Sequence, residues 1–312
     1  VGANDGMLHA FDAATGAEKW AYVPNPVIEN LYRLADVNYA TKHHFFVDGT
    51  PTVGDVKVGT AWKTLLVGGL NNGGIGYYAV DVTDPDHPQT MWEFNLCNSS
   101  ASGTGAGAST DCHIGKTYGR PVIAKLRDGT WAVLVTSGYN NTEKGGDGGG
   151  YLYVLNAGTG AIINRIATGQ GTTSSPSGLR EITYFVNNQT LNNTAERVYG
   201  ADALGHVWRF DINDVLPPTG IEAVRLASLR DAEGKAQPVT TRPELAEVDG
   251  VTMVMVGTGK ILADADLTDN SVQSVYAFKD PLTGNSPVYG DLRAVLKPMT
   301  LTQTGSGATA TR

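Results

Sequence analysis

A short unit of four residues recurs five times along this chain, and its recurrence limits the folds that the chain can adopt. Each copy has an aromatic or histidine residue, a small residue in most copies, an apolar residue, and a carboxylate or a substitute for it. The copies are His9-Ala10-Phe11-Asp12, Tyr78-Ala79-Val80-Asp81, Tyr153-Val154-Leu155-Asn156, Trp208-Arg209-Phe210-Asp211 and Tyr276-Ala277-Phe278-Lys279. Their apolar residues lie 69, 75, 55 and 68 residues apart. A propeller blade repeats every 40 to 50 residues or so, and we therefore expect long insertions between the repeated strands.

The sequence around each unit recurs as well. An apolar run that ends in or near a glycine precedes each copy, and a turn such as Thr15-Gly16 or Thr159-Gly160 precedes a further apolar stretch. Four copies open with a residue followed by proline, which suits the start of a strand. These pairs are Thr50-Pro51, Arg120-Pro121, Ser175-Pro176 and Arg242-Pro243. Four short antiparallel strands per copy predict an all-β protein, a β-propeller built of antiparallel four-stranded blades.

We interpret residues 1–312 as a single partial β-propeller domain with about five blades. The insertions fall at about residues 25–49, 95–119 and 139–150. The first copy lacks the outer strand that opens the others, and the polar stretch 300–312 completes no further copy. We expect a fragment of a larger protein, with any signal peptide outside it. One helix is predicted, over residues 27–35, with Asn25 as its N-cap, Pro26 in its first turn, and Ile28, Leu31 and Leu34 on its apolar face.

Composition and charge exclude two classes of protein. The formal net charge is −8 with an isoelectric point near 5.2, and the lysines and arginines are scattered along the chain. Nucleic acid is therefore not an expected partner, because its phosphates require clustered basic residues. No stretch approaches the roughly 18 consecutive apolar residues of a transmembrane helix, so this segment is predicted to contain none.

Cys97 and Cys112 flank a tract of serine, glycine, threonine and alanine. Such a tract has little apolar surface with which to fold by itself. A disulfide that closed it would stabilise the fold by roughly 3 kcal/mol in the chain-entropy model. We predict that Cys97 and Cys112 form a disulfide, which favours an exported protein. The alternative is a pair of unrelated buried thiols.

Residues suited to catalysis are few. His43 and His44 are adjacent and would point to opposite faces of a strand, so they are a poor chelating pair. His9 and His206 fall on the repeated strand, which favours a structural role. The glycine-rich run 145–150 lacks the lysine and the serine or threonine of a phosphate-binding loop. We predict that the protein is not an enzyme.

Two acidic stretches are candidates for calcium sites, because calcium favours carboxylates on alternate residues. The stretch 264–270 places aspartates at positions 264, 266 and 269 but lacks the glycine and the final glutamate of an EF-hand loop. A solvated acidic turn is the favoured interpretation, with a metal site as the alternative. The stretch 81–86 contains Pro85 at the repeated turn position and is interpreted as a turn.

Several segments resemble motifs of one known family, and they occur along this chain in the same order as in that family. The first is Val-Gly-Ala-Asn-Asp-Gly-Met-Leu-His-Ala-Phe-Asp at residues 1–12. The others are residues 39–44, 46–51, 66–69, 73–74, 79–83, 138–140, 152–155, 199–202, 205–211 and 256–260. Together they are similar to the C-terminal propeller of the PilC/PilY type IV pilus proteins, over nearly the whole chain.

The resemblance implies about five blades of a modified seven-bladed propeller. It also implies a pilus biogenesis factor and adhesin, exported to the outer membrane, the cell surface and the pilus tip, that controls pilus retraction and hence twitching. Its partners would be pilus subunits or minor pilins and a host-cell or surface receptor. The family carries a calcium loop where this chain reads Asn-Asn-Gln-Thr-Leu-Asn-Asn-Thr at 187–194. Neutral amides bind calcium poorly, so no cofactor or metal ligand is predicted for this chain.

Two rival functions share the same strand pattern. The pyrroloquinoline quinone (PQQ) dehydrogenases are quinoprotein propellers with turns like Thr15 to Trp20. They stack the quinone on a disulfide between adjacent cysteines, whereas Cys97 and Cys112 are far apart in the sequence. The second rival is a carbohydrate-binding propeller that uses the loop aromatics Tyr32, Tyr39 and Tyr139. A role for these tyrosines in packing loops onto the blades is favoured, and fold alone does not decide between functions.

Overall fold

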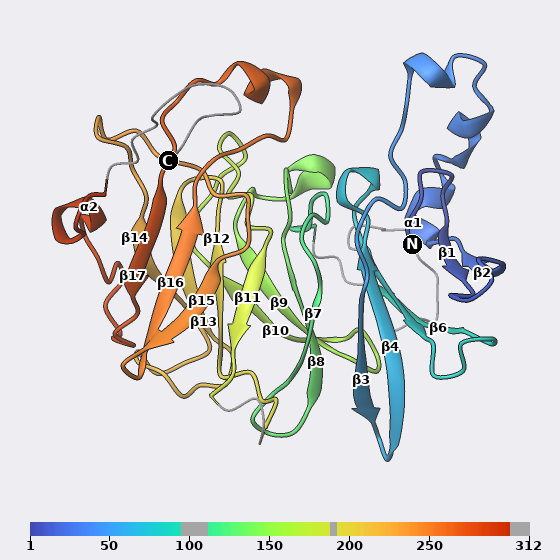
Figure 1. The fold of residues 1–312 in the computed structure, drawn as a ribbon, viewed down its shortest axis with the longest axis horizontal. Coiled ribbons are helices and arrows are strands. Elements are labelled where there is room, and N and C mark those ends of the chain that lie inside the picture. Colours follow the sequence, from blue (N-terminus) through green and yellow to red (C-terminus); the bar gives the residue numbers. More distant parts are fainter. Residues whose placement is uncertain (95–111, 188–191, 300–312) are drawn as a thin grey trace.

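Consecutive strands pair into five antiparallel sheets that follow one another along the chain (Figure 1). The computed structural model describes residues 1–94, 112–187 and 192–299. The second, third and fourth sheets each contain four strands, paired in the order of the sequence, and the fifth contains three. The first contains two. The prediction of a propeller with antiparallel four-stranded blades is confirmed in the three central sheets.

The strands of each blade occupy these ranges. The first blade is β1 (Leu8–Phe11) and β2 (Glu18–Tyr22), and the second is β3 (Thr52–Val58), β4 (Ala61–Gly69), β5 (Tyr77–Asp81) and β6 (Gln89–Phe94). The third is β7 (Val122–Lys125), β8 (Trp131–Thr136), β9 (Tyr151–Asn156) and β10 (Ile162–Ala167). The fourth is β11 (Ile182–Phe185), β12 (Arg197–Ala201), β13 (His206–Asp211) and β14 (Ala223–Ser228). The fifth is β15 (Glu244–Val248), β16 (Val251–Gly257) and β17 (Val275–Lys279).

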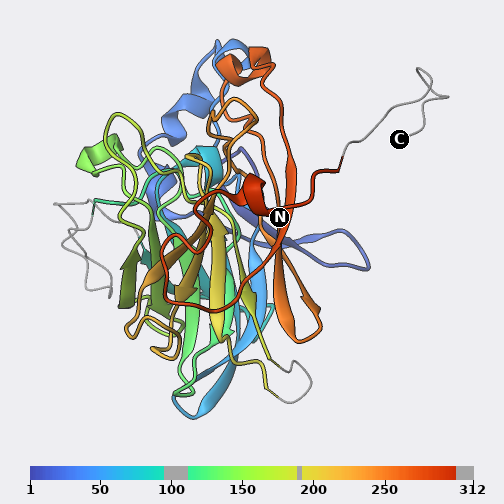
Figure 2. The same cartoon turned by 90° about the vertical axis from the view of Figure 1, so that its left-hand side faces the viewer.

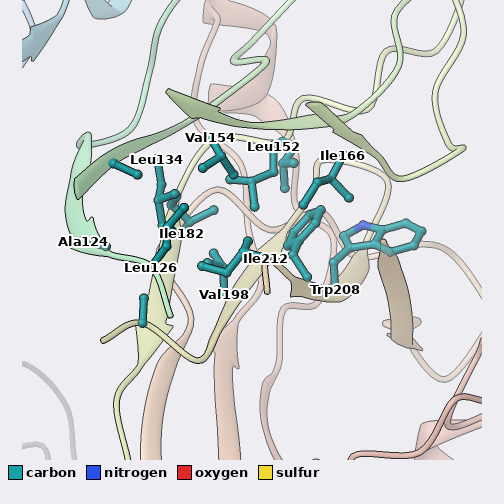
Figure 3. Close-up of a cluster of buried hydrophobic side chains, with 14 residues drawn as sticks. Ala124, Leu126, Leu134, Leu152, Val154, Ile166, Ile182, Val198, Trp208 and Ile212 are labelled. Carbon is teal, nitrogen blue, oxygen red and sulfur yellow. The ribbon is translucent and has the colours of Figure 1, made fainter. Parts of the chain in front are cut away.

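The recurring unit lies on β1, β5, β9, β13 and β17, and the central copies are covered on both faces. On β9, Tyr153 and Leu155 pack towards the second blade, whereas Leu152 and Val154 pack towards the fourth. Figure 3 shows Leu152, Val154 and Ile166 of the third blade facing Val198 and Trp208 of the fourth, among other residues. Side chains alternate between the faces of a strand, so one strand can contribute to two interblade cores. This explains why the unit is apolar or aromatic at successive positions.

The first and last blades lack this cover on one side within the described residues. Phe11 and Phe210 occupy the same position of the unit, yet Phe11 is 50% exposed and Phe210 is 0% exposed. On β17, Val275 is exposed while Tyr276 and Phe278 are buried against the fourth blade. Burial therefore follows from the presence of a neighbouring blade and not from the unit itself.

In four of the five units, the last residue accepts hydrogen bonds from the turn into the next strand. Asp12 accepts hydrogen bonds from the backbone N–H groups of Ala14 and Thr15, at 3.0 and 2.9 Å. The Thr15 backbone and hydroxyl hydrogen bonds lower the pKa of Asp12. Asp81, Asn156 and Asp211 accept equivalent bonds from residues two positions later. In the last copy Lys279 cannot accept, and Asp280 takes the role by accepting from the Leu282 N–H at 2.9 Å.

The strand that opens each central blade lies innermost and not at the outer edge. β3 contacts β7, and β11 contacts β15. The Thr52 hydroxyl donates to the Pro121 carbonyl at 2.8 Å, and the Arg180 guanidinium donates to the Thr240 carbonyl at 2.6 Å, so neighbouring blades are joined near the axis. The interpretation of the opening strand as an outer one was wrong. Strand order alone does not say which end of a sheet faces the axis.

The helix predicted over residues 27–35 is also wrong. The chain forms a four-residue helix, α1 (Asn25–Ile28), and then a 3₁₀ turn, η1 (Leu31–Ala35), with Pro24 and not Asn25 at the N-cap. An isolated short helix is marginal in water, so tertiary packing decides its length. Val27, Leu31 and Leu34 still pack into the core between the first two blades. The prediction of an apolar face was therefore correct for Leu31 and Leu34 and wrong for Ile28, which is 52% exposed while Val27 is buried in its place.

The remaining helical segments are short and lie outside the sheets. They are η2 (Tyr39–Thr41), η3 (Asn71–Gly73), η4 (Glu143–Gly145), η5 (Asp264–Thr268) and α2 (Leu292–Val295). The residues 25–49, η4 and η5 all lie at one end of the sheets, the upper end in Figures 1 and 2. None of the helices in the described ranges is long and apolar enough to span a bilayer.

Candidate functional site

Three of the expected insertions meet around one pocket of about 510 Å³ at the upper end of the sheets. The first insertion contributes Asn25, Ile28, Glu29 and His44, among others. Lys116 comes from the second insertion, and Glu143 and Lys144 come from the third. Loops held by a rigid scaffold are where binding residues concentrate, so this is the candidate functional site.

A fourth segment, which the sequence analysis did not select, completes the pocket. Asn72, Gly73 and Ile75 follow β4 and form its floor next to the first insertion. A Cβ atom on Gly73 would lie 1.7 Å from the Phe46 carbonyl oxygen, so only glycine allows the two backbones to approach. The sequence signal was the Asn-Asn-Gly-Gly run 71–74, which stands between two apolar strands.

Backbone hydrogen bonds fix the second and third insertions to each other. Lys116 and Tyr139 exchange two backbone bonds, at 2.8 and 2.9 Å. The buried Asn141 amide donates to the carbonyls of His113 and Gly149, at 2.9 and 2.8 Å. The second insertion is also tied to the loop after β4, because the Leu70 N–H donates to the Thr117 hydroxyl at 2.9 Å. The pocket wall is therefore preformed.

The pocket presents both signs of charge. The Lys116 ammonium donates to the Asn72 side-chain oxygen at 2.6 Å, and Glu143 accepts from the Asn140 amide at 2.9 Å. His44 is half-buried, and its Nε2 atom has no hydrogen-bond partner among the described residues. Burial, supported by the nearby charges of Arg33 and Lys116, lowers the pKa of His44. This ring is therefore neutral at pH 7, and its Nε2 atom is shielded from solvent.

Exposed apolar side chains gather on the first insertion. Ile28, Tyr32 and Val37 are 52%, 70% and 97% exposed. Tyr39, in contrast, packs on His43 and donates its hydroxyl to the His44 carbonyl at 3.0 Å. A concentration of exposed apolar groups on one loop indicates an interaction surface. Of the three loop tyrosines considered for carbohydrate contact, Tyr39 and Tyr139 pack within the loops, Tyr139 on Tyr118.

The two histidines of the repeated strand, His9 on β1 and His206 on β13, have carboxylate partners. His206 Nδ1 lies 3.1 Å from Oδ2 of Asp202, a fully buried carboxylate that also accepts from the Trp208 indole N–H. His9 lies between Glu18 and Asp5, at 2.8 and 2.9 Å, and these hydrogen bonds, Glu18 foremost, raise the pKa of His9. Each ring hydrogen-bonds a carboxylate of a nearby segment of the chain, which favours a structural role for both histidines.

The acidic stretch 264–270 forms η5 and the turn after it. Asp266 pairs with Lys260 at 2.9 Å and accepts from two backbone N–H groups, and the bond from Lys260 contributes most to the lowered pKa of Asp266. Within the described ranges, no group of three histidine, cysteine, aspartate or glutamate side chains could hold a metal ion. Residues 188–191 of the asparagine-rich loop lie outside those ranges. So does Cys97, and its pairing with Cys112 stays a prediction.

Comparison with known proteins places the chain in a family. Residues 1–294 match the family described as the PilY1 beta-propeller domain. The chain belongs to the PilY1 β-propeller family. A type IV pilus biogenesis factor PilY1 homolog of Xylella fastidiosa is 37% identical over 287 residues, covering 90% of this chain and 21% of that protein. The type IV pilus biogenesis factor PilY1 of Pseudomonas aeruginosa is 33% identical over 307 residues, covering 91% of this chain and 25% of that protein.

A solved structure agrees with this assignment. The crystal structure of the Pseudomonas aeruginosa PilY1 C-terminal domain superposes with a TM-score of 0.72 at 30% identity, over 92% of this chain and 59% of that one. The resemblance to the PilC/PilY proteins and the propeller fold are thereby confirmed. The chain spans only about a fifth to a quarter of the length of these curated relatives.

Proposed function

We propose that this propeller belongs to a type IV pilus biogenesis factor and that its insertion end binds a protein of the pilus. The proposal rests chiefly on the match to the PilY1 family over residues 1–294, whose curated relatives are named for pilus biogenesis. The pocket supplies the physical basis, because it joins preformed loops, both signs of charge and exposed apolar groups. These are the features of a protein-binding surface.

The finer parts of the proposal follow from the family resemblance. The protein is exported to the outer membrane and pilus tip, where it acts as an adhesin, contacts pilus subunits or minor pilins, and influences retraction and twitching. It performs no reaction. A purified protein that gains no bound chromophore after quinone addition would support this last point, whereas a stable quinone spectrum would favour the dehydrogenase alternative.

Ile28→Asp is expected to impair pilus assembly without unfolding the protein. Ile28 lies at the pocket rim with half of its surface exposed, so the new charge is tolerated in the free protein and disfavoured in an apolar contact. The experiment deletes the full-length gene and restores it with wild type or variant, counting surface pili by electron microscopy and measuring twitching zones. We expect the variant to restore fewer than about half of the pili.

The matched control is Ile163→Asp on β10, the outermost strand of the third blade, where the side chain is 38% exposed. It introduces the same charge away from the pocket and should restore pili as wild type does. Full piliation with Ile28→Asp would show that the pocket rim is not a contact. Normal piliation in the deletion strain itself would contradict the pilus function.

A further inference from the structure

A second, larger cavity lies along the axis of the blades, away from the insertion pocket. It has a volume of about 920 Å³ and is walled by the opening strands of three successive blades, β3, β7 and β11. Ligand pockets usually measure about 300 to 1,000 Å³, so this cavity is of ordinary size for a small or oligomeric ligand. Asn192 and Asn193 of the asparagine-rich loop border it, and the proposed function does not use it.

Aromatic side chains line this axial cavity. Trp62 of the second blade and Trp131 of the third meet at a ring-centroid distance of 5.8 Å and an interplanar angle of 71°. Trp62 is 60% exposed, although an indole buries more surface than almost any other side chain. Tyr184 of the fourth blade also lines the cavity and is 37% exposed. Flat aromatic faces open to an axial cavity are suited to stacking against a ring.

The charge of the cavity is opposite to that of the chain. Its lining includes Arg120, Lys125 and Arg242 but a single carboxylate, Asp55, whereas the whole chain carries a formal net charge of −8. Arg242 is paired with Glu244 at 2.8 Å. Neither Arg120 nor Lys125 has a side-chain hydrogen bond or ion pair with any described residue. Two uncompensated cations in one cavity favour an anionic ligand.

The edge of β7 argues against a peptide that adds as a strand. The Pro121 carbonyl already accepts from the Thr52 hydroxyl, and the Lys125 carbonyl accepts from the Ala195 N–H at 2.8 Å. A β-addition ligand would need these backbone groups free along the strand. The available groups are therefore side chains: aromatic faces, cations and the Asn193 amide.

We propose that the axial cavity binds an acidic oligosaccharide, with a sugar ring stacked on the exposed indole of Trp62, which Trp131 supports edge-to-face, and with carboxylates paired with Arg120 and Lys125. The C–H face of a pyranose is apolar and flat, as the indoles require, and each uronate ring carries one carboxylate. Arginine binds carboxylates through two parallel N–H bonds, which selects a uronate over a neutral sugar.

The test uses tetragalacturonate as the probe and the 312-residue chain as the protein. Calorimetry and tryptophan fluorescence should both report binding, and maltotetraose, its neutral counterpart, should bind at least about tenfold more weakly. Trp62→Ala and the double variant Arg120→Gln/Lys125→Gln should each weaken binding by about tenfold or more. Trp62 is largely exposed, and its removal should leave the melting temperature close to that of wild type.

The controls make the same changes away from the cavity. Tyr32→Ala removes an exposed aromatic ring and Lys42→Gln an exposed cation of the first insertion, and both should bind as wild type does. The proposal is overturned if tetragalacturonate does not bind, if maltotetraose binds equally well, or if the cavity variants match the controls. Pentaglutamate that bound more tightly than tetragalacturonate would also overturn the proposal, because it would assign the cavity to an acidic peptide. A thymidine octanucleotide that bound more tightly would assign the cavity to single-stranded nucleic acid.

Discussion

Replacing Asp280 with alanine is expected to lower the free energy of unfolding by about 3 to 5 kcal/mol, because it leaves a buried guanidinium without its counter-charge. Asp280 and Arg209 are 1% exposed and lie 2.7 Å apart, joining the fifth blade to the fourth. The second carboxylate oxygen accepts from the Tyr199 hydroxyl at 2.7 Å. Burial raises the pKa of Tyr199, which keeps this donor protonated.

The measurement is urea unfolding followed by circular dichroism and tryptophan fluorescence. Asp128→Ala is the control, since Asp128 is exposed and, among the described residues, accepts a single hydrogen bond, from the Thr130 N–H at 2.8 Å. This change should cost less than about 1 kcal/mol. The double variant Arg209→Met/Asp280→Leu should recover much of the loss, because it removes both charges together. Equal costs for Asp280→Ala and Asp128→Ala would show that the ion pair does not hold the two blades together.

The second large effect is expected for Phe210→Ala, at about 3 to 5 kcal/mol of lost stability. The Phe210 ring is fully buried between the third and fourth blades, and its removal leaves a cavity that the rigid sheets cannot fill. Phe11 is the same residue at the same position of the recurring unit, but half of its surface is exposed. Phe11→Ala should therefore cost less than about 1 kcal/mol.

The comparison of the two phenylalanine variants separates the stability contributed by the recurring unit itself from the stability contributed by packing against a neighbouring blade. Both changes remove the same ring from an equivalent strand, so differences in unfolding midpoint at equal slope report interblade packing. Similar costs for the two variants would contradict the burial pattern described here.

The strands and their repetition could be predicted from sequence because their cause is local. A strand covered on both faces must be apolar at successive positions, as in residues 152–155, and the following turn needs an acceptor such as Asp12 or Asn156. The family resemblance rests on the same strands and turns, because the family's motifs lie on them and follow one another in the same order. Both predictions agree with the structure and with the comparisons.

The candidate sites depend on contacts that sequence spacing does not encode. The insertion pocket needs the loop after β4 to meet the first insertion at Gly73, and these segments are joined only by the fold. The axial cavity brings Trp62 and Trp131 together from different blades. The helix over 27–35 was wrong for a related reason, since packing of Val27 and Leu31 on the blades determines where the helix ends.

Hydrogen exchange measured by mass spectrometry on the 312-residue chain tests the central claim most directly, namely that the recurring units form blades packed side by side. β5, β9 and β13 are each paired with strands on both edges and packed on both faces. Within the described residues β17 is paired on one edge only, and the second edge of β1 meets only the two residues Val1 and Gly2. The account predicts the slowest exchange in peptides that cover β5, β9 and β13, and faster exchange in β1 and β17. Exchange in β9 as fast as in β1 would contradict it.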